Sequence, residues 1–169
     1  TTVNDFIIRD NVFQDQYEYA VYVYLTKSPK VISNTFTSTL FNSLYRGIFL
    51  STCRDSVIVS KNKLLLDSGV GITCSSTNGL PSNYVTIDNN VVYSTSTNNS
   101  SGIAASGNYI NILHNTIVVN GPTTGSYCLS VNNVNYLEVK NNILQQKGLG
   151  YVYYTTGTQT NFQSNFNNL

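Results

Sequence analysis

Residues 84–92 read Tyr84-Val85-Thr86-Ile87-Asp88-Asn89-Asn90-Val91-Val92, and this stretch decides the fold. Apolar and polar residues alternate up to a pair of asparagines, after which a second apolar run begins. Alternation with a period of two is typical of a half-buried strand, and asparagine favours a turn. The stretch therefore predicts two short strands that are joined by a tight corner at Asn90.

The same unit recurs seven times along the chain. Its turn asparagines are Asn11, Asn34, Asn62, Asn90, Asn115, Asn142 and, in a degraded copy, Asn165. Their spacings of 23 to 28 residues indicate a solenoid or another repeat array. An apolar or aromatic residue stands three positions before each of them: Ile8, Val31, Val59, Ile87, Ile112, Val139 and Phe162. We expect these side chains to form one inward-facing column.

Each unit is followed by a variable loop and a further apolar pair, which predicts a third strand. The expected inward pairs are Val21/Val23, Ile48/Leu50, Ile72/Cys74, Ile103/Ala105, Tyr127/Leu129 and Tyr151/Tyr153. Three strands in about 26 residues are too few for a propeller blade, and no segment carries the helical period that a βαβ unit requires. The sequence thus predicts an all-β, right-handed parallel β-helix of about seven coils, with residues 1–169 as a single domain.

Two of the repeat units, Val85 to Val92 and Ile110 to Ile117, together with the Gly102-Ile103 strand, resemble the parallel β-helix repeat of the pectate-lyase-like superfamily. The resemblance covers nearly the whole chain, and it is specific for the fold rather than for an activity. It implies that the turn asparagines stack as a ladder of buried amides, each donating to one coil and accepting from the next. The ladder residues are expected to be Asn11, Asn34, Asn62, Asn90, Asn115 and Asn142.

Composition narrows the range of partners. Charged residues make up 10% of the 169 residues and the net charge is +1, so no strong field favours nucleic acid or an anionic membrane. No apolar run is long enough to span a bilayer, so membrane insertion is not expected. Neither end shows a capping helix. We therefore expect a segment of a longer protein, with self-association or a neighbouring domain covering the ends.

Residues that could perform chemistry are scattered. No two carboxylates stack on adjacent coils in the outward columns, and Glu138 and Lys140 are expected to form a surface ion pair. His114 is the single histidine and falls in the turn beside the ladder. The three cysteines lack the spacing of a metal site and are expected to be separate apolar fillers. We expect no metal and no cofactor, and no catalytic residue is assigned.

Aromatic residues in the first two coils give the candidate binding site. The candidate ligand-binding residues are Tyr22, Tyr24, Tyr45, Phe49, Arg54 and Asp55. Tyr22 and Phe49 fall in the same outward column and should be neighbours. Exposed rings beside a few polar groups suit stacking on sugar rings or a protein interface, and ordinary cross-strand packing is the simpler alternative.

These observations favour a non-catalytic β-helix segment of a secreted or cell-surface protein, which presents a wall for polysaccharide binding or adhesion. The resemblance leaves two alternatives open. One is a polysaccharide lyase or glycoside hydrolase, and the other is a segment of a trimeric phage tailspike or fibre. The fold alone does not choose among them.

Overall fold

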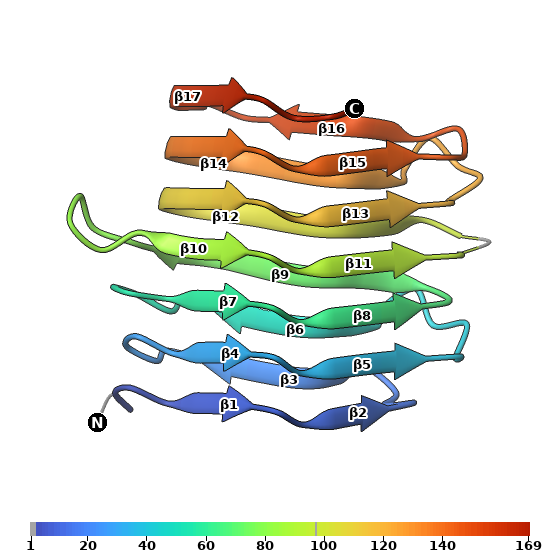
Figure 1. The fold of residues 1–169 in the computed structure, drawn as a ribbon, viewed down its shortest axis with the longest axis horizontal. Helices are drawn as coiled ribbons and strands as arrows, with labels where there is room; N and C mark the ends of the chain where they lie inside the picture. Colours follow the sequence, from blue (N-terminus) through green and yellow to red (C-terminus); the bar gives the residue numbers. More distant parts are fainter. Residues whose placement is uncertain (1–2, 97) are drawn as a thin grey trace.

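The computed structural model describes residues 3–96 and 98–169, which form a stack of parallel coils. Figure 1 shows the coils following one another in chain order, from β1 at one end to β17 at the other. Six coils have three strand positions each, and β17 starts a seventh. The expected parallel β-helix is confirmed, with a coil number close to the expected seven.

Each coil runs through three strand positions. Strands at the first position are β1 (Ile7–Arg9), β4 (Lys30–Ile32), β7 (Ile58–Ser60), β10 (Val85–Asp88) and β17 (Thr160–Asn165). Strands at the second are β2 (Val12–Gln14), β5 (Thr35–Ser38), β8 (Lys63–Leu66), β11 (Val91–Ser94), β13 (Thr116–Val119) and β15 (Ile143–Gln146). Strands at the third are β3 (Tyr19–Tyr24), β6 (Arg46–Ser51), β9 (Gly69–Asn78) and β16 (Tyr151–Thr156).

Two long strands, β12 (Ser100–Leu113) and β14 (Tyr127–Lys140), serve two coils each. The first half of each lies at the third position of one coil, and the second half lies at the first position of the next. They join the first-position and third-position strands into one 11-stranded sheet, and the second-position strands form a separate 6-stranded sheet. All strand pairs within these sheets are parallel, as a solenoid of stacked coils requires.

The core fills the inside of the coils with the inward columns read from the sequence. Val31, Val59, Ile87, Ile112 and Val139 lie on successive first-position strands and are fully buried. The residues two positions after the ladder asparagines are buried beside them: Phe36, Leu64, Val92, Ile117 and Leu144. The three cysteines are also buried and free of disulfides. Burial of these columns supplies the main driving force for folding.

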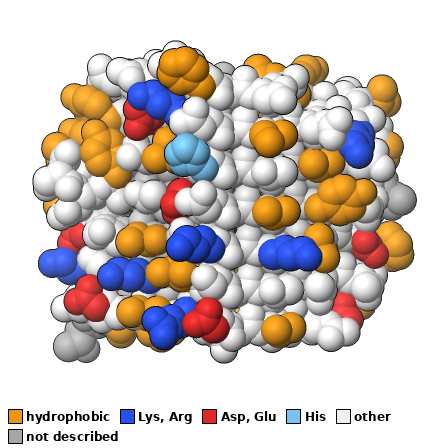
Figure 2. Space-filling model, viewed as in Figure 1, with side chains coloured by type: hydrophobic (Ala, Val, Ile, Leu, Met, Phe, Trp, Pro, Cys, Tyr) orange, Lys and Arg blue, Asp and Glu red, His pale blue; other side chains and the backbone are white. Residues whose placement is uncertain are grey.

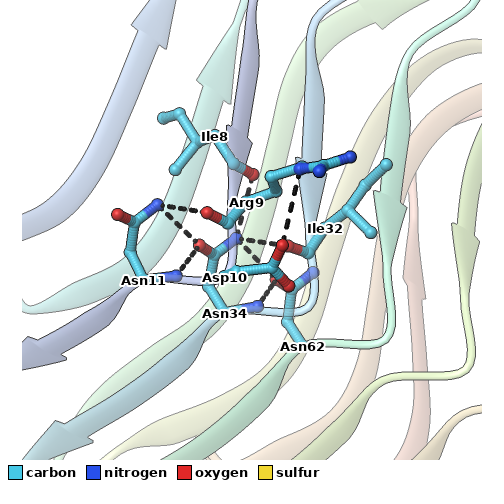
Figure 3. Close-up of polar contacts among 7 residues, drawn as sticks. All are labelled: Ile8, Arg9, Asp10, Asn11, Ile32, Asn34 and Asn62. Carbon is cyan, nitrogen blue, oxygen red and sulfur yellow. Dashed lines mark hydrogen bonds and ion pairs between the residues drawn. The ribbon is translucent and has the colours of Figure 1, made fainter.

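The corner between the first and second strand positions holds the asparagine ladder. Figure 3 shows its first rungs, where Asn11, Asn34 and Asn62 lie one above another with their amides joined. The Oδ1 of Asn90 accepts hydrogen bonds from both the backbone N and the Nδ2 of Asn62, each at 3.0 Å. Its Nδ2 donates to the Val59 carbonyl at 2.9 Å and to Asn115 Oδ1 at 3.0 Å. Because these amides are buried, the ladder supplies hydrogen-bond partners for polar groups that would otherwise remain unpaired.

The residue before each ladder asparagine has a left-handed backbone, which makes the corner sharp. These residues are Asp10, Ser33, Lys61, Asn89, His114, Asn141 and Phe166, with φ between 54° and 58°. Asparagine and aspartate tolerate this conformation better than most residues. His114 is exposed in this column, so the structure places it as a turn residue beside the ladder.

The register of the last coils differs from the one expected from the sequence. Ile103 pairs with Leu129 and Leu129 with Tyr153, so Tyr127 and Tyr151 are not the inward partners of Ile103. The ladder ends at Asn167 rather than Asn165, because Asn167 Oδ1 accepts from the backbone N and Nδ2 of Asn142, each at 2.9 Å. Both errors are slips of two residues, which an alternation pattern does not distinguish. Tyr127 also changes face, because the adjacent residues Cys128 and Leu129 are both buried and break the alternation.

We predict that Asn90→Ala lowers the free energy of unfolding by about 3–5 kcal/mol. The buried backbone N–H and Nδ2 of Asn62 lose their shared acceptor, and the bonds that Asn90 Nδ2 donates to the Val59 carbonyl and to Asn115 are lost with it. Asn11→Ala is the matched control at the exposed end of the ladder and should cost about 1 kcal/mol or less. Chemical denaturation followed by circular dichroism measures both values. Equal losses for the two variants would contradict a cooperative ladder.

Candidate binding trough

Four aromatic rings of the first two coils gather on the outer face of β3 and β6. Tyr22 and Phe49 are cross-strand neighbours whose ring centroids lie 5.2 Å apart with an interplanar angle of 25°. Tyr19 stacks on both, at 5.2 Å from Tyr22 and 5.6 Å from Phe49, and Tyr24 lies 6.4 Å from Tyr22. The guanidinium of Arg46 lies 5.9 Å from the Phe49 ring centroid. We call these four rings the first aromatic cluster.

Local burial explains why so many rings share one face. In β3 both Ala20 and Val21 turn toward the core, so the strict alternation breaks at this point. As a result Tyr19, Tyr22 and Tyr24 all lie on the outer face, although Tyr19 and Tyr22 are three residues apart. In β6, Gly47 occupies the position equivalent to Ala20, and a Cβ there would come within 2.6 Å of Leu64 Cδ2.

A second aromatic cluster lies on the same face in the last two coils. Tyr127 stacks on Tyr154 with ring centroids 4.3 Å apart and an angle of 15°, and Tyr151 lies 6.2 Å from Tyr127. The strand pairing makes the pair Tyr127 and Tyr154 equivalent to the pair Tyr19 and Phe49. The alternation pattern did not reveal this cluster: it predicts that Tyr127 and Tyr151 point inward, but the buried neighbours Cys128 and Leu129 break the alternation and leave Tyr127 on the outer face. The density of tyrosines in residues 151–154 was the available signal.

Small side chains separate the two clusters. Strand pairing places Thr73, Ala104 and Ser130 in order between Phe49 and Tyr154. A hollow of about 130 Å³ opens over this floor, which is completed by Ser75, Ser106 and Asn132. A wider hollow of about 530 Å³ continues from it toward the corner formed by Asn78, Asn108 and Asn133. We call this floor, with an aromatic cluster at each end, the trough.

The corner beside the trough carries a second, shorter ladder of amides. Asn108 Nδ2 donates to Asn78 Oδ1 at 2.6 Å, and Asn135 Nδ2 donates to Asn108 Oδ1 at 2.9 Å. Unlike the buried ladder, this one is partly exposed and borders the wider hollow. It fixes amide groups at the edge of the trough at the spacing of the coils.

Tyr45 does not belong to the first aromatic cluster. Its side chain is fully buried, and its hydroxyl has no hydrogen-bond partner. Burial raises the pKa of Tyr45 to about 12. The sequence placed Tyr45 with the other rings because it directly precedes β6, but its carbonyl accepts from Val70 and the ring packs into the loop corner instead. Tyr45 is therefore a core residue.

Arg54 and Asp55 lie in the corner that follows β6, next to the first aromatic cluster but not within it. They line a hollow of about 440 Å³ together with Leu25, Asn78 and Leu80. The Asp55 carboxylate lies 3.3 Å from Lys27 Nζ. Leu25 directly follows Tyr24, so this hollow opens at the edge of the first aromatic cluster.

Other polar residues considered from the sequence lie apart from the trough. Glu138 and Lys140 form the expected ion pair, on a first-position strand. Within residues 3–96 and 98–169, no three side chains of His, Cys, Asp or Glu gather as metal ligands. The same part of the chain contains no helix with the length and apolarity needed to cross a membrane.

Comparison with known proteins agrees with this geometry. A family model described as a right-handed β-helix region matches residues 1–97, more than half of the chain. The chain therefore belongs to the right-handed β-helix family. No curated protein and no solved structure matched the chain.

We predict that Tyr45→Phe raises the free energy of unfolding by about 1–2 kcal/mol, because it removes a buried hydroxyl that has no partner. Thermal or chemical denaturation at neutral pH measures the change. A loss of stability would show that the hydroxyl is satisfied in solution and would contradict the prediction.

The same residue predicts a pH dependence. The pKa of Tyr45 is raised from 10.0 to about 12, so its contribution to stability is complete below pH 10 and is lost as the pH rises from 10 to 12. Over this window the wild type should lose roughly 2–3 kcal/mol relative to Tyr45→Phe. Denaturation curves of both proteins between pH 8 and about 12 give this difference, and parallel curves would contradict it.

Proposed function

We propose that this β-helix binds an uncharged polysaccharide in the trough, as a non-catalytic part of a secreted or cell-surface protein. The observation that carries the proposal is the pair of equivalent aromatic clusters on one face, separated by a floor of small hydroxyl and amide side chains. Aromatic rings provide flat apolar surfaces for the faces of sugar rings, and short polar side chains provide hydrogen bonds for sugar hydroxyls.

The spacing of the clusters fits an extended chain that lies along the solenoid axis. Four strand steps separate Phe49 from Tyr154, through Thr73, Ala104 and Ser130. At about 4.8 Å per step, the two rings lie roughly 19 Å apart. An oligosaccharide of several rings can therefore contact both clusters at once, whereas a single sugar can contact only one. Simultaneous contact increases affinity through effective concentration.

The charge of the trough favours a neutral ligand. The floor residues Thr73, Ser75, Ala104, Ser106, Ser130 and Asn132 carry no ionisable group. Burial raises the pKa of Tyr127, and a hydrogen bond with Glu18 is the main cause of the raised pKa of Tyr19, so both phenols are neutral at physiological pH. Arg46 is the cation beside the first cluster, and it lies over the Phe49 ring.

The same floor favours binding over cleavage. Hydrolysis of a glycosidic bond generally requires two carboxyl groups that are about 5–10 Å apart across the bond. None of the six floor residues can supply such a group. Of the carboxylates near the first cluster, Glu18 is hydrogen-bonded to Tyr19 and Asp55 is paired with Lys27. The floor therefore supplies contacts rather than acid–base chemistry.

We predict that removing either cluster weakens polysaccharide binding. Tyr22→Ala with Phe49→Ser, or Tyr154→Ser alone, should raise the Kd for the bound glycan about 5–30-fold, which corresponds to about 1–2 kcal/mol of lost stacking. A glycan array identifies the ligand, and isothermal titration calorimetry with its oligomers measures the affinity. Oligomers too short to reach both clusters should bind more weakly and lose sensitivity to one of the two variants.

Tyr93→Ser is the matched control, because Tyr93 is an exposed tyrosine on the outer face of the 6-stranded sheet, away from the trough. It should leave the Kd unchanged. Incubation of the wild type with the same glycan should release no new reducing ends and no unsaturated sugars. Unchanged affinity in both cluster variants would contradict the trough as the binding site, and release of fragments would contradict a non-catalytic role.

A further inference from the structure

A separate hollow opens on a different face of the solenoid, on the outer side of the first-position strands. Its volume is about 230 Å³, and its lining comes from four successive coils: Tyr84, Asn111, Tyr136, Leu137, Glu138, Asn161 and Gln163. Figure 2 views the molecule from this side and shows hydrophobic side chains gathered at the left of the upper coils. The long strands β12 and β14 contribute to both places, with their first halves in the trough and their second halves here.

Tyr84 and Tyr136 form one wall of this hollow, and Tyr109 packs against both. Tyr109 and Tyr136 stack with ring centroids 4.4 Å apart and an angle of 8°, and Tyr84 meets Tyr109 edge-on at 5.8 Å. Tyr109 and Tyr136 have φ values of 53° and 57°, a conformation that is unfavourable for a bulky side chain. The same corner of the next coil uses Asn161, which is better suited to it.

Hydrogen-bonding groups form the other wall. Strand pairing places Asn111, Glu138 and Gln163 in one outward column on adjacent coils. The Oδ1 of Asn111 is buried and has no hydrogen-bond partner. The amide can therefore rotate to offer this oxygen to a ligand without losing an existing hydrogen bond of the oxygen. Glu138 is paired with Lys140, which leaves this wall with no net charge.

From this geometry we propose that the hollow binds a single neutral pyranose ring. One face of the sugar packs on the Tyr136 ring, and its hydroxyls donate to Asn111 Oδ1 and to the Glu138 carboxylate. The small volume fits one ring rather than an extended chain, and the balanced charge favours an uncharged sugar over an acidic one. This site does not depend on the trough, because the two places share no lining residue.

The test is a titration of the ¹⁵N-labelled protein with the methyl glycosides of glucose, galactose and mannose, followed by ¹H–¹⁵N correlation spectra. We expect shift changes at Asn111, Tyr136 and Glu138 with at least one glycoside. Tyr136→Asn should weaken binding at least tenfold, because it removes the ring and introduces the residue that the next coil accepts at the same corner. Glu138→Gln should weaken it about fivefold, because the hydrogen bond it accepts is no longer charge-assisted.

Tyr154→Ser is the matched control, since it alters the trough and should leave these shift changes intact. Absence of shift changes with all three sugars would overturn the proposal, as would changes that persist in Tyr136→Asn or vanish in Tyr154→Ser. Circular dichroism of Tyr136→Asn distinguishes a lost site from a lost fold, and Glu138→Gln keeps the test decisive if that variant unfolds. Polysaccharide binding that is lost in Tyr154→Ser, without monosaccharide shifts in the wild type, would overturn this second site and leave the trough standing.

Discussion

The architecture depends on the hydrogen bonding of amides between one coil and the next. Through its Nδ2, a buried ladder asparagine such as Asn90 donates to a backbone carbonyl of the preceding coil and to the ladder side chain of the next, so no coil completes its polar contacts alone. The apolar columns favour any compact stack, but the amide hydrogen bonds form only when equivalent corners lie directly above one another. The ladder therefore fixes the phase of the coils, and this phase in turn decides which side chains meet on the outer faces.

The role of the ladder in aligning the coils also explains what the sequence could predict. Alternation with a period of two identifies strands and their faces, and the recurring asparagines align the first six corners, so the fold class and the ladder from Asn11 to Asn142 follow directly. Alternation does not distinguish a register from one shifted by two residues. In the last coils the expected anchors are weak, because Asn165 and Asn167 both fit the pattern. Only the hydrogen bonds of Asn142 show which one continues the ladder.

That ambiguity had a direct effect on the site. The register of β14 places Leu129 and Val131 in the inward column, rather than Tyr127 and Leu129. Tyr127 instead belongs to an aromatic cluster that mirrors the first one. Tyr45 shows the opposite error, since a loop residue has no alternation to indicate its face, and its ring is buried. Tyr22, Tyr24 and Phe49 were placed on the outer face from strand patterns alone, and they lie there together. The alternation pattern thus placed side chains correctly in the regular strands of the first coils, and it failed in loops, where the alternation is broken and at the end of the repeat.

Because the corners are interchangeable, the solenoid can change its length without changing its ends. The coils that separate the aromatic clusters carry the small residues Thr73, Ala104 and Ser130 on the trough face, and each enters the stack through the same ladder contact. Gain or loss of one such coil by gene duplication or deletion would move the clusters apart or together by one strand spacing, about 4.8 Å. The distance between the two clusters can therefore change only in steps of one coil, both in evolution and in protein engineering.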